Sequence, residues 1–510
     1  MTTICARTHV LAGVRAVEVI TEVHLALGLP AFAIVGLPEA STRESKERVR
    51  SAILSSGFEF PQRRITINLA PADLPKHGTG FDLAIALGIL AASGQLPPPA
   101  LDGHEFIAEL GLNGDLRHVR GVLPAALACR KARAILLTSL PDATEAALVD
   151  DLLVYGATNL VDVVQHLSGV RHLQPVINVT PPDVSNDAAA DLAQVHGQPR
   201  ARRALEVAAA GGHNLLLVGP PGTGKTMLAR RLPGILPPLA NDDALTTAAI
   251  ASAAGQRIDP AHWRRRPFRA PHHSASAVAI VGGGRVPRPG EITLAHHGVL
   301  FLDELPEFNR DVLESLREPL ECGHVVVSRA AGSTEFPASF QFIAAMNPCP
   351  CGYFGDSPSR CRCTPDQIQR YVSRISGPLL DRLDLHIEVP RESGWLKSGA
   401  TNARETSADV RARVAAARER QSNRQQHTNA AIPLPANAFE QWLTTPALDL
   451  LQAANQRLAL SARATQRVLR VARTIADLAG HDVVAESHLA EALSLRCLDR
   501  FMRRRLDITQ

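Results

Sequence analysis

The chain has 510 residues, of which 45% are hydrophobic and 20% are charged, and its formal net charge is +4. This composition predicts packed domains and excludes a disordered chain. The length allows roughly two to four domains of the usual ~100–200 residues each. The net charge is too small to indicate a polyanionic partner unless basic residues cluster locally. No apolar stretch approaches the ~18–20 residues of a membrane span and the N-terminus lacks the features of a signal peptide, which together predict a cytoplasmic protein without a membrane partner.

Residues 1–170 are expected to form an N-terminal domain of mixed strands and helices. The capping-box pattern Ser41–Glu44 predicts a helix that continues to about Ser56, and the alternation of Arg64–Ala70 predicts a half-buried strand. The other predicted elements are a β-rich stretch over 10–35, an apolar helix over 80–92, a hairpin over 106–119 around Asn113-Gly114, a helix over 121–131 and a strand over 134–140. The Pro-, Asp- and Asn-containing residues 171–190 predict a linker.

A phosphate-binding loop follows an apolar strand at residues 215–218. Its backbone N–H groups can surround phosphates, Lys225 can reach the β- and γ-phosphates, and the Thr226 hydroxyl can bind Mg²⁺. The loop consists of Gly219, Pro220, Pro221, Gly222, Thr223, Gly224, Lys225 and Thr226. This motif in this context predicts ATP and Mg²⁺ as cofactors.

Two later strands end in polar residues that suit hydrolysis. The strand ending at Leu302 is followed by Asp303, which can hold Mg²⁺, and Glu304, which can polarise the attacking water. The strand Phe340–Met346 is followed by Asn347, whose amide can orient that water. Strands alternate with helices over 191–395, which predicts a doubly wound α/β core, and one P-loop indicates one ATPase module per chain.

Residues 396–510 are rich in Ala, Arg and Leu and are expected to form a small helical lid. The predicted helices cover 408–421, 436–443, 446–455, 461–478 and 485–495.

Several longer motifs resemble the magnesium-chelatase-like branch of the AAA+ ATPases, and specifically its ComM/YifB type. They are Phe268-Arg-Ala-Pro-His-His-Ser and the runs at 287–298, 301–308, 346–352 and 374–384. The resemblance implies a homo-hexameric ring with ATP sites between subunits. It also implies single-stranded or branched DNA as partner, with helicase or branch-migration activity during integration of transforming DNA.

The same resemblance indicates arginines that would act on nucleotide. Arg382 corresponds to the arginine that related proteins present to the γ-phosphate of a neighbouring subunit, worth ~10³-fold or more in rate. The alternatives are a local pair of Arg382 with Asp381 or Asp384, or Arg374 as the arginine finger. In the lid, Arg463 fits the sensor arginine, with Arg467 and Arg470 as competitors on nearby helix faces.

An insertion hairpin that points into the ring channel is also implied by the family. The glycine-rich run at 282–284 with Arg285 and Arg288 could contact DNA phosphates, and a solvated loop is the alternative. The histidine pairs at 272–273 and 296–297 favour structural or nucleotide-proximal roles over metal binding.

Four cysteines lie within fifteen residues and could close a structural Zn²⁺ site. Cys349, Cys351, Cys361 and Cys363 have the spacing C-x-C–x₉–C-x-C, tighter than the usual C-x₂-C knuckle. Reduced free cysteines or a redox pair are the alternatives.

The N-terminal domain resembles Lon-type protease and ribosomal S5-like domains, but it departs from a protease at the nucleophile. Gly80 or Phe81 stands where the serine is expected, and residues 121–127 lack the expected lysine, so proteolysis is not expected. The P-loop and the acid pair predict an ATPase, and the family resemblance implies that it is a ring-forming motor that remodels DNA. A magnesium-chelatase-like metal-insertion subunit and a protein-remodelling AAA+ factor are the alternatives.

Overall fold

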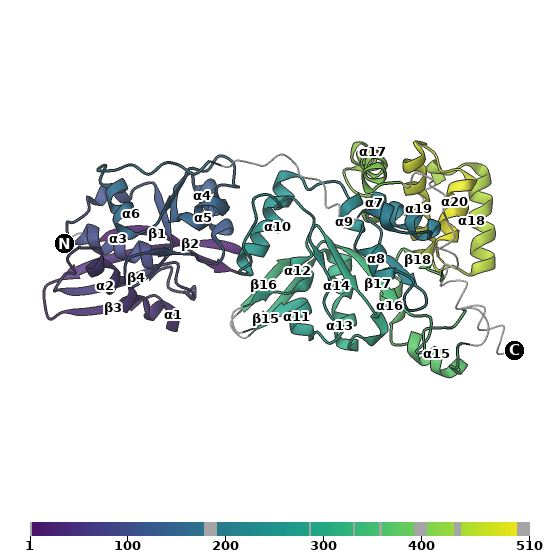
Figure 1. Cartoon of the computed structure of the whole chain (residues 1–510), viewed down its shortest axis with the longest axis horizontal. Coiled ribbons are helices and arrows are strands. Elements are labelled where there is room, and N and C mark those ends of the chain that lie inside the picture. Colours follow the sequence, from purple (N-terminus) through teal and green to yellow (C-terminus); the bar gives the residue numbers. More distant parts are fainter. Residues whose placement is uncertain are drawn as a thin grey trace.

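The computed structural model describes residues 3–177, 191–284, 287–329, 332–355, 360–391, 405–432 and 440–496. The chain forms an elongated molecule (Figure 1). The N-terminal region (residues 3–177) lies at one end, the central region (191–391) in the middle, and the C-terminal region (405–496) at the other end.

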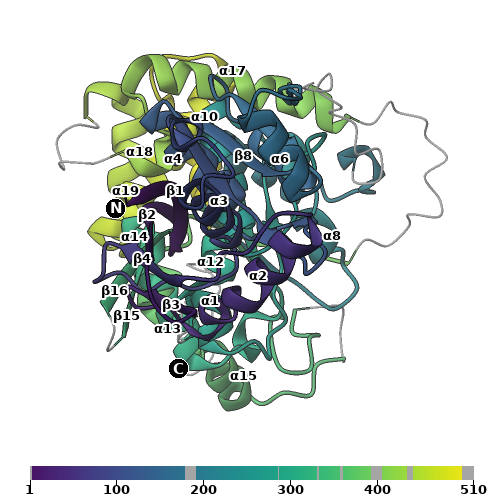
Figure 2. The ribbon, with the colours of Figure 1, turned by 90° about the vertical axis from the view of Figure 1, so that its left-hand side faces the viewer.

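A seven-stranded sheet organises the N-terminal region, in the order β3-β4-β2-β1-β5-β8-β9. Strands β1, β2 and β4 pair antiparallel, and the remaining pairs are parallel. The strands are β1 (Ile4–Ala12), β2 (Arg15–Ala26), β3 (Ala31–Val35), β4 (Arg64–Ala70), β5 (His104–Ile107), β8 (Ile135–Ser139) and β9 (Val154–Ala157), with the small hairpin β6 (Glu109–Leu110) and β7 (Leu116–Arg117). The helices are α1 (Ala40–Arg43), α2 (Ser45–Ser55), α3 (Asp82–Ala92), α4 (Val122–Ala132), α5 (Leu140–Ala146) and α6 (Leu160–Leu167). Figure 2 views the molecule from this end.

Most predicted elements of this region are confirmed. Strand β4 has the predicted bounds, and its alternate residues Ile65, Ile67 and Leu69 are buried. The hairpin around Asn113-Gly114 is confirmed but shorter than predicted, because β5 instead pairs in parallel with β1 and β8.

The predicted capping box at Ser41 is wrong. Ser41 lies inside the one-turn helix α1, and its hydroxyl accepts a hydrogen bond from the Gly78 N–H at 3.3 Å. Helix α2 begins separately at Ser45, without a side-chain cap. A tertiary partner therefore replaces the local one that the pattern predicts.

A sheet of five parallel strands forms the core of the central region, in the order β11-β14-β17-β10-β18. Its strands are β10 (Leu215–Val218), β11 (Phe268–Arg269), β14 (Val299–Leu302), β17 (Gln341–Met346) and β18 (Leu385–Glu388). Strands β10, β14 and β17 are buried throughout, as the uninterrupted apolar runs predict for a sheet covered on both faces. The P-loop strand β10 thus lies inside the sheet.

Short helices and two hairpins complete the central region. The helices are α7 (Pro199–Gly211), α8 (Lys225–Ala229), α9 (Leu232–Ile235), α10 (Asn241–Ala253), α11 (Ala277–Val281), α12 (Glu291–Leu294), α13 (Arg310–Ser315), α14 (Arg317–Cys322), α15 (Pro365–Val372) and α16 (Gly377–Leu380). The hairpins are β12 (Gly282–Gly283) with β13 (Arg288–Pro289), and β15 (His324–Arg329) with β16 (Gly332–Pro337). The predicted linker falls largely on 178–190, outside the described residues.

The C-terminal region is helical, as predicted. It contains α17 (Ser407–Gln425), α18 (Thr445–Leu458), α19 (Ala462–Ala479) and α20 (Glu486–Ser494). The helix predicted over 436–443 lies mostly outside the described residues, and its described end is the 3-10 turn Glu440–Trp442. Helices α17 and α19 share a buried cluster with α7, so this region packs directly on the core.

The N-terminal and central regions share an apolar contact between α4 and α10. The Gly121 N–H donates to Ser252 O at 3.1 Å across this contact. Over the residues that the structure describes, no helix combines the length and apolar character needed to cross a membrane.

Candidate functional site

Three strand ends bring the predicted nucleotide residues to one edge of the central sheet. Val218 is opposite Met346 in the β10–β17 pair, and Leu302 is opposite Ala344 in the β14–β17 pair. Because the strands are parallel, the residues after each carboxyl end meet at that edge, where open α/β sheets bind ligands.

The P-loop has glycine where its geometry requires it. A Cβ on Gly219 would lie 2.2 Å from Val389 O, so only glycine fits beside β18. Gly222 and Gly224 adopt φ values of +79° and +87°, the left-handed conformation that favours glycine. This backbone is the kind that turns N–H groups toward one anionic ligand.

Lys225 is buried at the start of α8 and lies in the centre of the site. Its ammonium donates to Gly219 O at 2.6 Å, to Pro220 O at 2.9 Å and to the Asn347 side-chain oxygen at 3.2 Å. Burial lowers the pKa of Lys225, and the carboxylates of Asp303 and Glu304 act against that effect. The P-loop lysine and the asparagine that is predicted to orient the attacking water are therefore in direct contact.

Thr226 and Asp303 also meet, since the Thr226 hydroxyl donates to Asp303 Oδ2 at 2.5 Å. The second Asp303 oxygen accepts from the Glu304 N–H at 2.9 Å. A hydroxyl and a carboxylate in contact beside a phosphate-binding loop are the hard oxygen ligands that Mg²⁺ prefers. The residues present thus fit a magnesium–nucleoside triphosphate.

Glu304 lies beside one of the histidines that the sequence singled out. Its backbone is left-handed, with φ +52°, and its carboxylate lies 3.4 Å from His273 Nδ1. The ring of His273 contacts those of His272 and Phe308. The expectation of a nucleotide-proximal role for the first histidine pair therefore agrees with the position of His273.

The second pair is structural in its contacts, because buried His296 accepts from the Ser339 N–H.

Arg382 forms an ion pair that the sequence did not indicate. Its guanidinium binds Glu321, at the end of α14, and Pro378 O, and its side chain is 14% exposed. The alternative of a local pair with Asp381 or Asp384 is not what the structure shows, since the partner Glu321 comes from another helix.

The competing residue Arg374 is 54% exposed and binds Glu307 at 2.9 Å. Within the described chain, the hydrogen-bond partners of Arg374 and Arg382 lie outside the P-loop. An action of either arginine on a phosphate would thus require a neighbouring subunit or a rearrangement.

The three arginines considered in α19 differ in what they contact. Arg463 is exposed in the first turn, whose cap is Ser461. Arg467 lies 3.4 Å from Asp384, a buried carboxylate next to β18, and Arg470 donates to Ile432 O. Of the three, Arg467 links the C-terminal region to the core in this structure.

The region predicted as the insertion hairpin contains the short antiparallel pair β12–β13, and Arg288 is exposed on it. Arg285, the other predicted DNA contact, lies outside the described residues.

The four cysteines converge in the loop after Asn347. Cys349 Sγ lies 3.3 Å from Cys351 Sγ and 3.7 Å from Cys361 Sγ, and all four sulfurs, including that of Cys363, lie within 4.8 Å of one another. A tetrahedron with Zn–S bonds of ~2.3 Å has S···S edges of ~3.8 Å, so this cluster can hold a metal ion. Burial opposes ionisation of Cys351, but backbone hydrogen bonds, including one at Tyr353, lower its pKa to about 6.

The cysteine loop also touches the P-loop. A Cβ on Gly352 would lie 2.7 Å from Pro221 Cδ, so the two loops are in close contact there. The cysteine loop therefore packs beside both Pro221 and Asn347, a position that the sequence spacing did not reveal.

This sheet order, with a P-loop and two polar strand ends on one edge, defines a P-loop nucleotide-binding protein of the AAA+ class. Comparison with known families agrees. Residues 191–395 match the family described as "Magnesium chelatase, subunit ChlI", 21–139 match "Subunit ChlI of Mg-chelatase", and 404–496 match "Magnesium chelatase, subunit ChlI C-terminal".

Full-length relatives extend this result. The chain is 48% identical to "Competence protein ComM" of Haemophilus influenzae over 96% of this chain and 97% of that protein. It is 47% identical to the uncharacterized protein YifB of Escherichia coli over 97% of each. The magnesium-chelatase 38 kDa subunit of Acidiphilium rubrum is 27% identical over 45% of this chain and 60% of that protein.

The chain therefore belongs to the ComM/YifB family of magnesium-chelatase-like AAA+ proteins. This membership and the parallel central sheet confirm the predicted AAA+ α/β core.

Proposed function

We propose that this chain is an ATP-dependent, ring-forming DNA motor, which acts as a helicase or branch-migration factor in natural transformation and homologous recombination. The observation that carries its ATPase part is the meeting of Thr226 with Asp303 and of Lys225 with Asn347 at one sheet edge. These four residues come from three strand ends, and together they match the parts of a nucleotide-hydrolysing site.

The residues divide the chemistry among them. The P-loop binds the phosphates, and Thr226 and Asp303 hold Mg²⁺, which supplies charge neutralisation when bound. Glu304 is the general base that takes a proton from the attacking water, and Asn347 orients that water. His273, 3.4 Å from Glu304, is placed to hold this carboxylate in position.

A ring supplies the second half of the site. Arg382 acts on the γ-phosphate of a neighbouring subunit, and Arg463 in the C-terminal lid couples lid position to nucleotide. Glu321, the partner of Arg382, is 63% exposed, so water can solvate its carboxylate when Arg382 leaves it. This exposure supports an exchange of Arg382 from Glu321 to a phosphate.

DNA as the partner rests on the relative named as a competence protein and on the insertion hairpin. Arg285 and Arg288 would bind backbone phosphates without reading sequence.

The domains that we assign are those expected from the sequence: a Lon-like, proteolytically inactive domain over 1–170, a linker over 171–190, an ATPase core over 191–395 and a lid over 396–510. Zn²⁺ in the cysteine cluster is structural, because four thiolates leave no open position.

A metal-insertion subunit is the second candidate, supported by the names of the matched families. The chelatase subunit, however, aligns with only 45% of this chain, whereas the competence protein aligns with 96%. The fuller alignment favours the DNA motor.

Migration of a synthetic four-way junction tests the proposal. The full-length protein with ATP and Mg²⁺ should convert the junction to duplex products, and Lys225→Ala should not. ATP hydrolysis without junction migration, and without stimulation by DNA, would overturn the DNA part while leaving the ATPase intact.

A further inference from the structure

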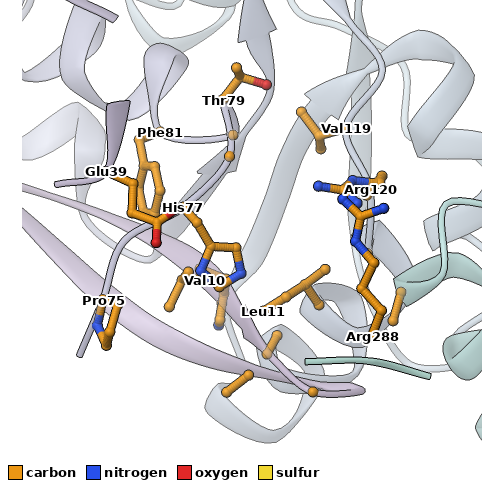
Figure 3. A pocket seen from close by; sticks show the side chains of 18 of the residues that line it. Val10, Leu11, Glu39, Pro75, His77, Thr79, Phe81, Val119, Arg120 and Arg288 are labelled. Carbon is orange, nitrogen blue, oxygen red and sulfur yellow. The ribbon is translucent and has the colours of Figure 1, made fainter. Parts of the chain in front are cut away.

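A cavity of about 820 Å³ lies where the N-terminal region meets the central region (Figure 3). The N-terminal region contributes β1, the loop that contains His77, and Arg120. The central region contributes the insertion hairpin with Arg288 and the tip of the β15–β16 hairpin with Ser333 and Thr334. Two hairpins of the ATPase core and the N-terminal region thus share one cavity.

Contacts between the regions fix the position of Arg120. The next residue, Gly121, is hydrogen-bonded to Ser252 at the end of α10. The aliphatic stem of Arg120 lies against Gly255, where an added Cβ would be 2.9 Å from the arginine Cδ. Arg120 is therefore held across the boundary between the regions, and its guanidinium points into the cavity beside Arg288 (Figure 3).

The two arginines repel one another. Burial lowers the pKa of Arg120 and Arg288 lowers it further, with no carboxylate among the groups that act on Arg120. His77 lies between Glu39 and the two arginines (Figure 3). Burial lowers the pKa of His77, Glu39 raises it, and both arginines lower it. The cavity thus collects cations from both regions at one end.

The acids of the cavity are placed elsewhere. Glu39 lies beside Phe81 on the side away from the arginines (Figure 3), and Glu109 is paired with Arg117 at 3.8 Å. Over the described residues, no ion pair joins a carboxylate to Arg120 or Arg288. Both arginines are exposed to solvent, and an anion that binds both would offset their repulsion.

We propose that Arg120, Arg288 and His77 form a phosphate-binding site that joins the N-terminal region to the insertion hairpin. Guanidinium groups match phosphate geometry in bidentate fashion, and a neutral imidazole N–H and the Thr334 hydroxyl can supply further donors. The phosphate belongs either to a nucleic-acid backbone or to a free polyphosphate. Only the first source rests on the proposed function.

The first arm of the test measures binding of a labelled single-stranded oligonucleotide to the full chain by fluorescence anisotropy, over a series of salt concentrations. Arg120→Gln and Arg288→Gln should each lower the slope of log affinity against log salt by about 0.7, a loss of about fivefold at ~0.1 M salt. Arg63→Gln, which removes the same charge from an exposed position of the N-terminal region, should leave the binding unchanged.

The second arm titrates inorganic pyrophosphate calorimetrically into Lys225→Ala, in which the P-loop lysine is absent. Binding that is lost on adding Arg120→Gln, but kept on adding Arg63→Gln, identifies a free polyphosphate as the ligand. The phosphate site is overturned if Arg120→Gln and Arg288→Gln bind the oligonucleotide and pyrophosphate as well as the protein with unsubstituted arginines does. It is also overturned if neither probe binds.

The two arms separate this site from the proposed motor. If DNA affinity is unchanged in Arg120→Gln and Arg288→Gln and pyrophosphate does not bind, the phosphate site is overturned but the proposed motor function is not. Pyrophosphate binding that depends on Arg120, in a protein that does not bind DNA, supports the site and overturns the motor.

Discussion

Thr226 and Asp303 share a hydrogen bond of 2.5 Å although 77 positions separate them in the sequence. Thr226 lies in the first turn of α8, directly after the P-loop, and Asp303 directly follows β14. Strand β17 lies between β10 and β14, so the contact spans the width of a neighbouring strand. The two oxygens therefore mark one place for a cation at the sheet edge.

Lys225→Ala should abolish nucleotide-dependent activity. The ammonium is buried and bound to three oxygens around the P-loop, so its removal takes the nearest positive charge from the phosphate position. We expect a loss of ~10²-fold or more in ATP hydrolysis, the usual cost of removing one preorganised electrostatic group. Release of phosphate from ATP measures it, and Arg63→Gln is the matched control for lost charge. Hydrolysis at the normal rate would contradict the assignment.

Glu304→Gln should separate binding from hydrolysis. The substitution keeps the size of the side chain but removes the base, so ATP should remain bound while turnover falls by ~10²–10⁴-fold. Retention of radiolabelled ATP on the assembled protein, beside single-turnover hydrolysis, measures both effects. Normal turnover in this variant would show that another group takes the proton.

Local patterns sufficed to predict the strands and loops of the site. The strand predicted over 340–346 is observed as Gln341–Met346, because a short and mainly apolar run suits a strand that is covered on both faces. The P-loop and the acid pair follow their strands directly, and parallel strands place such residues at one edge. Lys225, Asp303, Glu304 and Asn347 were therefore predictable as a set.

Tertiary partners were not predictable from the sequence. Glu321 and Arg382 are 61 positions apart on different elements, and no periodicity relates them. The contact of Gly352 with Pro221 and the approach of Arg120 to Arg288 depend in the same way on how loops and regions pack. Ser41 shows the reverse case: the local pattern predicts a helix cap, but its hydroxyl accepts a hydrogen bond from the distant Gly78 N–H instead.

Cysteine substitution should release zinc and weaken the ATPase site. We expect about one zinc per chain in the purified protein, and loss of that metal in Cys361→Ser or Cys363→Ser. Since the cysteine loop packs on Pro221, the thermal midpoint should also fall. Elemental analysis and thermal unfolding measure these changes, and Cys322→Ser, an exposed cysteine outside the cluster, is the control. A metal-free wild type with four titratable thiols in the cluster would favour free cysteines.

Acidification below pH 6.5 should destabilise the protein through His296. Burial, aided by His297, lowers the pKa of His296 to about 3, whereas an unfolded histidine has a pKa of ~6.5. Between these values the unfolded chain holds a proton that the folded chain lacks, so the free energy of unfolding rises with pH, by at most ~1.4 kcal/mol per pH unit. Above about pH 6.5 this contribution is complete.

His296→Asn isolates that histidine, because an amide oxygen can still accept the Ser339 N–H bond of 3.0 Å. The variant should show a shallower dependence of the thermal midpoint on pH between about 6.5 and 5. His24→Asn, in the N-terminal sheet, controls for the loss of a histidine. An unchanged pH dependence in His296→Asn would assign the acid sensitivity to another group.

Mixing two inactive variants should restore hydrolysis if Arg382 acts across a subunit boundary. In a mixed ring, an Arg382→Ala subunit supplies an intact P-loop and a Lys225→Ala neighbour supplies Arg382, so roughly one interface in four is complete. Lys225→Ala mixed with Glu304→Gln is the matched control, since both residues belong to the same half-site and no complete interface forms. Recovered phosphate release in the first mixture alone supports action in trans. Recovery with Arg374→Ala in place of Arg382→Ala, and none with Arg382→Ala, would assign the finger to Arg374. Glu321→Gln should keep its activity, because the ion pair that it removes is exposed on the glutamate side.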